Sequence, residues 1–209
     1  MWVGAPIIFT GFSLGSFYAL IALGFSLIFG IAGAFNLAHG EMIVLSGYLA
    51  FALWQYLQVP FFWILPICSL VLLCLTLPLH YLLRRLPEPY GLNTMVVTLG
   101  LALLLQTLLL AWFSADYRLL NLHWPAVAFP GLDFTFPLHQ GMLILLALVV
   151  IGAVHLLLRR TFLGKALRAI IQDREAAQMA GINVQRLALV AFGLGGLLIG
   201  LAGPLLAQN

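Results

Sequence analysis

The sequence predicts an all-α protein, a polytopic integral membrane helix bundle with about six spans. Of its 209 residues, 64% are hydrophobic and only 7% are charged, and the mean hydropathy is +1.12. A water-soluble domain usually carries about 25% charged residues, so this chain has too few to cover a surface in water. Its apolar residues form continuous runs rich in Leu. These runs favour spanning helices over the alternating strands of a membrane barrel.

The apolar runs divide the chain into successive segments, each close to the ~20 residues that a helix needs to cross the hydrocarbon. The segments are 7–31, 38–57, 61–83, 93–113, 140–158 and 187–206. They predict one transmembrane domain over 1–209. The chain ends soon after the last segment, which we interpret as an incomplete, C-terminally truncated bundle.

Small residues recur at helical spacing in the first and last segments. They form Gly11-x3-Gly15-x3-Ala19 and Gly196-x3-Gly200. Such spacing lets helix backbones approach closely, so both stretches are expected to be packing faces.

The basic residues predict the orientation. Eight of the nine Lys and Arg residues fall in the loops 84–92 and 159–186, and only Arg118 lies in the loop 114–139. Short loops rich in Lys and Arg stay on the cytoplasmic side. We therefore expect the first two loops to be cytoplasmic, the loop 114–139 to be external, and the N-terminus to be external.

The segment 159–186 is predicted to hold an amphipathic helix. Apolar side chains recur at Leu163, Leu167, Ile170 and Ile171, and polar ones at Lys165, Arg168, Gln172 and Glu175. Gly181 offers a helix C-cap. Two interpretations stay open: the helix docks into a groove on a partner, or it lies against anionic lipid headgroups.

A second polar cluster lies where the first two spans meet. Asn36, His39 and Glu41 fall within six residues of one another. A structural interpretation makes Asn36 the N-cap of the second helix, lets Glu41 complement the helix dipole, and pairs His39 with a neighbouring helix. Contact with a transported solute and gating at the cytoplasmic mouth are the alternatives. Gln106, polar within a span, either bonds across helices or lines the pathway.

Several catalytic signatures do not occur in the sequence. There is no G-x4-G-K-[ST] loop and no H-E-x-x-H. We therefore expect no ATP hydrolysis by this chain, no catalytic residue, no metal site and no bound cofactor. Nothing in the sequence indicates binding to nucleic acid.

Three blocks resemble the permease subunits of branched-chain amino acid ABC importers. They are 13–50, with its Asn36-x-Ala38-His39-Gly40-Glu41 string, 94–106, and 164–183. The last contains Glu175-Ala176-Ala177 and, three residues later, Gly181, which resembles the EAA loop of ABC importer permeases. No I-x-L-P follows Gly181 at the usual distance.

The resemblance implies a function and a set of partners. The chain would translocate branched-chain amino acids across the bacterial inner membrane, while separate ATP-binding subunits use the ATP. A second homologous permease subunit, a periplasmic or extracellular solute-binding protein and membrane lipid would be its other partners. The residues implied in coupling to the ATPase are Arg168, Asp173, Glu175, Ala176, Ala177 and Gly181.

Two other functions are compatible with the sequence. A permease of the same family for urea or short amides would share every motif described above. An ion-coupled carrier or channel would need acidic groups within the membrane, and only Glu41 has a suitable position.

Overall fold

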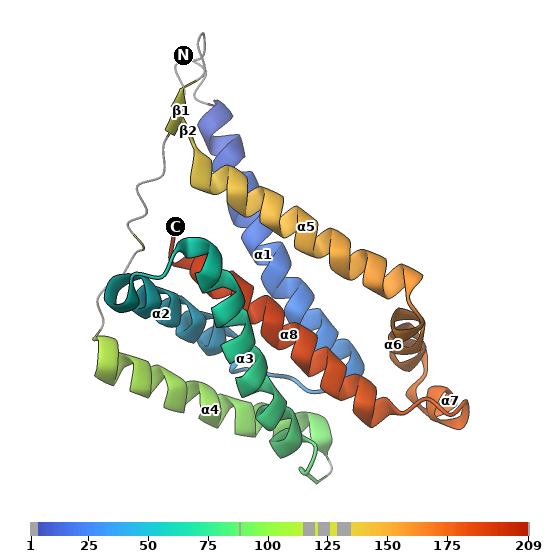
Figure 1. Ribbon diagram of the computed structural model, residues 1–209. Helices are drawn as coiled ribbons and strands as arrows, with labels where there is room; N and C mark the ends of the chain where they lie inside the picture. Colours follow the sequence, from blue (N-terminus) through green and yellow to red (C-terminus); the bar gives the residue numbers. More distant parts are fainter. Residues whose placement is uncertain (1–3, 88, 115–119, 121–125, 129–134, 209) are drawn as a thin grey trace.

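The computed structural model describes residues 4–87, 89–114, 120, 126–128 and 135–208, and these are almost entirely helical (Figure 1). The helices are α1 (Gly4–Ala32), α2 (His39–Leu57), α3 (Phe61–Leu83), α4 (Tyr90–Phe113), α5 (Leu138–Arg160), α6 (Phe162–Gln172), α7 (Arg174–Met179) and α8 (Val184–Leu206). Two strands, β1 (Ala126–Ala128) and β2 (Thr135–Pro137), pair antiparallel in the loop between α4 and α5.

The predicted apolar segments are confirmed as helices. Within the described residues, five of them are long and apolar enough to cross a membrane: α1, α3, α4, α5 and α8. The sixth, α2, has 19 residues, but it opens with His39 and Glu41 and so falls short of the others in hydropathy. The polytopic helical fold is therefore confirmed, and α2 is the long helix, among those described, that is not apolar enough to count as a span.

Helix α8 forms the centre of the bundle and packs against α3, α1 and α2 (Figure 1). Its glycines lie directly on neighbouring backbones. A Cβ at Gly200 would lie 2.7 Å from the Cys68 carbonyl oxygen, and a Cβ at Gly196 would overlap the Thr76 side chain. The hydroxyl of Ser46 donates to the Gly200 carbonyl at 2.9 Å. The predicted packing face at Gly196-x3-Gly200 is thus confirmed.

The corresponding prediction for α1 is wrong within the described chain. A Cβ at Gly11 or Gly15 would meet nothing within 4 Å. The reason is that α1 contacts α8 through its C-terminal half, where a Cβ at Gly24 would lie 3.3 Å from the Leu198 side chain. The N-terminal half of α1 extends past α8, beside α5 (Figure 1).

The segment between α5 and α8 departs from the single amphipathic helix that its pattern predicts. The backbone breaks at Asp173 (φ −153°, ψ 109°) and divides the segment into α6 and α7. The Asp173 carboxylate accepts the backbone N–H groups of Glu175 and Ala176, each at 3.0 Å. Because a short polar side chain that caps a new helix competes with continuation of the old one, the break is local in origin.

Candidate functional site

The chain between α1 and α2 is held in a fixed non-helical path. Gly33 has a positive φ of 65°. The Asn36 side-chain oxygen accepts the Ala38 N–H at 3.1 Å, and Ala38 itself is the N-cap of α2 with no side-chain cap. The prediction that Asn36 is the N-cap is therefore wrong, since its side chain closes a turn two residues before the N-cap Ala38.

Thr98 of α4 fastens this turn to the bundle. Its hydroxyl oxygen accepts the Leu37 N–H at 3.1 Å and lies 3.1 Å from the Phe35 carbonyl oxygen. Thr98 is fully buried. This role has no signal in the sequence, because a threonine inside a helix commonly bonds to its own backbone, as Thr98 also does with Thr94 at 2.7 Å.

The three polar residues of the 36–41 string have different environments. Asn36 and His39 are buried, whereas Glu41 is half-buried in the first turn of α2. The His39 ring lies edge-on to Phe25, with 5.7 Å between ring centroids. The Asn36 amide nitrogen has no hydrogen-bond partner among the described residues. The break thus places an unpaired polar group inside the bundle.

Gln106 does not join this cluster. It lies exposed on α4, a helix that buries only Thr94, Thr98 and Leu109 among its described residues. In the bundle, α4 packs mainly against α2 (Figure 1). Gln106 therefore points away from the contacts made within this chain.

The second predicted site, the α6–α7 hairpin (162–179), begins with a capped helix at a tight corner. Thr161 caps α6 by accepting the Gly164 N–H at 3.0 Å. Leu167 and Ile170 are buried, while Lys165 and Arg168 are exposed. A side chain at Gly164 would overlap the carbonyl groups of Leu157 and Leu158, so the corner requires glycine.

Helix α7 ends in a Schellman motif. Gly181 has φ 83°, its N–H donates to the Gln178 carbonyl at 2.9 Å, and the Ile182 N–H donates to the Ala177 carbonyl at 3.0 Å. The helix end predicted at Gly181 is thus confirmed, with Ala180 as the C-cap and Gly181 as the left-handed residue after it. Asp173 and Gly181 fix the two ends of α7 by local bonds alone.

The predicted coupling residues on α7 fall into two groups, one exposed and one buried. Glu175 and Ala176 are exposed, and so is Met179, at 90% of its surface. Ala177 is only 4% exposed and packs toward the bundle. We call Glu175, Ala176 and Met179 the outer face of α7, since they are the part a partner could reach.

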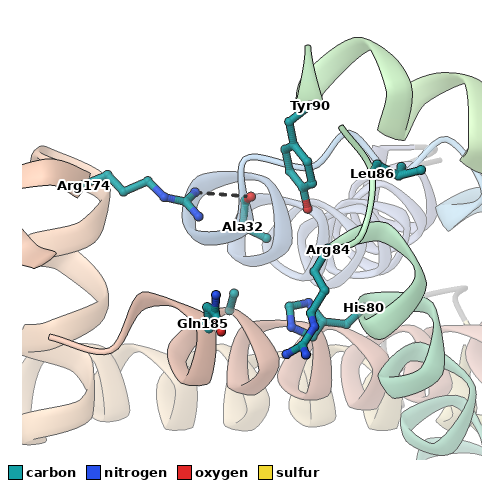
Figure 2. A pocket seen from close by; sticks show the side chains of 8 residues that line it. Ala32, His80, Arg84, Leu86, Tyr90, Arg174 and Gln185 are labelled. Carbon is teal, nitrogen blue, oxygen red and sulfur yellow. Dashed lines mark hydrogen bonds between the residues drawn. The ribbon is translucent and has the colours of Figure 1, made fainter. Parts of the chain in front are cut away.

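Arg174, which the sequence pattern did not single out as a site, connects the hairpin to the break between α1 and α2. Its guanidinium Nη1 donates a long hydrogen bond of 3.5 Å to the carbonyl of Ala32, the last residue of α1 (Figure 2). Two residues earlier, a Cβ at Gly30 would lie 3.5 Å from Ile171 of α6. The hairpin therefore contacts α1 immediately before the chain turns into the Asn36 cluster.

Comparisons with known proteins show what this sequence is similar to. The family model described as "Branched-chain amino acid transport system / permease component" matches residues 7–209. The high-affinity branched-chain amino acid permease protein LivH of Escherichia coli K12 is 26% identical over 96% of this chain and 69% of its own length. For the corresponding protein BraD of Pseudomonas aeruginosa the values are 25%, 95% and 69%.

The probable branched-chain amino acid transport permease protein LivH of Methanocaldococcus jannaschii is 30% identical over 90% of this chain and 61% of its own length. No solved structure matches the chain.

Proposed function

Because the chain belongs to the family of branched-chain amino acid transport permease components, we propose that it is the membrane-spanning subunit of an ATP-driven importer for these amino acids. The proposed complex comprises this chain, a second homologous permease subunit, two ATP-binding subunits and an external solute-binding protein. It operates in the bacterial inner membrane, with the N-terminus outside and the loops 84–92 and 159–186 inside. The permeases LivH and BraD carry names that support this assignment.

The observation that carries the proposal is the connection between the α6–α7 hairpin and the end of α1. The outer face of α7 and Arg168 offer exposed contacts for an ATP-binding subunit. A displacement of the hairpin would act on Ala32 through the Arg174 hydrogen bond and on the neighbourhood of Gly30 through the Ile171 side chain. Since the local caps hold the shape of α7, the hairpin transmits such a displacement instead of unfolding.

We propose that the displacement of the hairpin shifts the turn at 33–38. It is non-helical, and it places Asn36 and His39 inside the bundle with Glu41 just beyond. Broken helices in transporters lie where a pathway or a gate needs polar groups. We assign Asn36, His39 and Glu41 to gating at the cytoplasmic mouth. Gln106 is assigned to a pathway wall or a contact with the second permease subunit, because it faces away from this chain.

Branched-chain amino acids are the proposed solute, and urea or short amides are the runner-up. Transport of radiolabelled leucine into proteoliposomes that contain the whole complex tests this directly. Uptake should require ATP and be suppressed by excess unlabelled isoleucine or valine. Suppression by urea alone, or leucine uptake driven by an ion gradient without ATP, would contradict the assignment.

A substitution tests the gating role. Glu41→Gln keeps the size of the side chain but removes its charge, so ATP-driven uptake should fall about tenfold, the equivalent of ~1.4 kcal/mol. The matched control is Gln55→Ala on the exposed far end of α2, which should leave uptake unchanged. Equal uptake and equal ATPase stimulation in the Glu41 variant and the control would remove Glu41 from the gate.

A further inference from the structure

Two adjoining cavities lie where α3, α4, α7 and α8 converge, outside the proposed pathway. The larger has a volume of about 430 Å³ and receives Arg84, Arg174, Tyr90 and Gln185 (Figure 2). The smaller, of about 230 Å³, adds Arg186 and Tyr81. Arg84, Gln185 and His80 line both cavities. The two cavities therefore form one site with a shared wall.

The lining of this site is strongly basic. It includes three guanidinium groups, and no carboxylate of the described residues lines either cavity. The guanidinium carbon of Arg84 lies 5.0 Å from the centre of the Tyr81 ring. Arg174 donates one hydrogen bond, from Nη1, to the Ala32 carbonyl. Arginine carries five N–H donors and no acceptor, so donors remain for a ligand that only accepts. An anion with several oxygens is the chemical complement.

His80, at the base of the site, has a ring nitrogen that a polar ligand could pair with. His80 is only 3% exposed, and its Nδ1 has no hydrogen-bond partner among the described residues. A buried polar atom without a partner is uncommon in folded proteins. A ligand that carries hydrogen-bonding oxygens, or water held by it, would satisfy this nitrogen beneath the arginines.

The position of the site indicates that the anion comes from a lipid headgroup. Arg84 caps the C-terminal end of α3, Tyr90 begins α4, and Gln185 and Arg186 lie in the first turn of α8. All belong to the end of the bundle with the basic loops, at the depth of lipid headgroups. Beside Arg84, Tyr81 and Leu82 are exposed apolar side chains on α3. Acyl chains can lie along them while a headgroup occupies the cavity.

We propose that this site binds the phosphate of an anionic phospholipid headgroup from the cytoplasmic leaflet, between Arg84 and Arg174. Basic pockets between transmembrane helices on this side of a membrane suit such headgroups. Because Arg174 also contacts Ala32, the bound lipid would adjoin the link between the hairpin and α1. Its binding is measured on the chain itself and does not depend on the solute that the complex carries.

The test measures lipid binding to the purified full chain in neutral detergent by native mass spectrometry. The probes are short-chain phosphatidylglycerol, phosphatidylcholine with the same acyl chains, and inorganic phosphate. Phosphatidylglycerol should bind at least tenfold more tightly than phosphatidylcholine, and millimolar phosphate should not displace it. Arg84→Gln should weaken phosphatidylglycerol binding about tenfold. Arg85→Gln is the matched control, because the neighbouring arginine is exposed but lines neither cavity.

Gln185→Glu is a second variant for the case in which Arg84→Gln does not fold. It keeps the side-chain size and places a carboxylate in the wall, so it should repel the headgroup to a similar extent. Equal weakening by Arg84→Gln and Arg85→Gln would overturn the proposal in favour of general surface attraction. Full displacement by inorganic phosphate would identify a soluble anion instead of a lipid. Unchanged binding to Gln185→Glu would place the lipid elsewhere.

Discussion

Helix α8 and the α6–α7 hairpin are neighbours in the sequence, but their shapes have different origins. The hairpin is shaped by its own ends, through Thr161, Asp173 and Gly181. By contrast, α8 is fixed by its neighbours, because its glycines allow the backbones of α2 and α3 to lie directly against it. A locally capped element can move as a unit and keep its form, whereas a helix packed backbone to backbone cannot move without its neighbours. This difference is compatible with our proposal that the hairpin moves as a unit against the bundle around α8.

The largest expected effect comes from filling the contact of α8. Gly200→Ala would place a Cβ 2.7 Å from the Cys68 carbonyl oxygen and 2.8 Å from the Ser69 nitrogen, against backbone that cannot move aside. We expect a loss of about 3 kcal/mol in stability, at the upper end for overpacking. Thermal unfolding of the chain in detergent, followed by size-exclusion chromatography, measures it.

The matched control for this change is Gly15→Ala. A Cβ at this position meets nothing within 4 Å, so the higher helix propensity of alanine should leave stability unchanged or raise it by ~0.5–1 kcal/mol. If both variants lost stability equally, the central role of α8 would be wrong.

An intermediate effect is expected where the hairpin meets the core. Arg174→Gln shortens the side chain that reaches the Ala32 carbonyl while it leaves α7 and its caps in place. ATP-driven uptake should fall about tenfold, although the hairpin still binds the ATP-binding subunit. Proteoliposome transport and co-purification of the subunits measure the two properties separately.

Arg160→Gln, in the last turn of α5, is the control for charge, because Arg160 is exposed and has no hydrogen bond to α1 among the described residues. Loss of subunit binding in the Arg174 variant, or equal transport by both variants, would show that Arg174 does not transmit the motion.

The smallest effect is expected within the hairpin. Asp173→Ala removes the acceptor for the Glu175 and Ala176 N–H groups and should cost about 1 kcal/mol of local stability. Hydrogen exchange at these two amides should accelerate, while that of α8 stays slow. Asp173→Asn keeps a side-chain oxygen and should behave like the native chain. Faster exchange throughout α8 would mean that the hairpin is not locally stabilised.

The same contrast explains which features could be predicted from the sequence. A long apolar run predicts a spanning helix without any knowledge of what packs against it, so all six long helices were predictable. The Gly181 cap was also predictable, because its cause lies in adjacent residues. The sequence pattern could not show that Gly11 and Gly15 are open while Gly196 and Gly200 are covered, since the same spacing serves both.

Features that depend on distant parts of the chain were missed. Thr98 holds a turn more than sixty residues away, and Arg174 bonds to the end of α1. Neither contact has a local signature. The break at Asp173 was missed for a different reason. The helical spacing of apolar residues continues past Asp173, and only the preference of aspartate for the N-cap position argues for a new helix there.

The most direct test of the central claim, that the hairpin couples this chain to an ATP-binding subunit, is cross-linking from a cysteine placed at Ala176. The background replaces Cys68 and Cys74 by alanine, and the membranes contain the cognate ATP-binding subunits. Ala176→Cys should cross-link to the subunit with a yield that changes with nucleotide, and Ala177→Cys, buried against the bundle, should cross-link poorly. If Ala176→Cys reacts with water-soluble thiol reagents but forms no cross-link with or without nucleotide, the hairpin is not the coupling element.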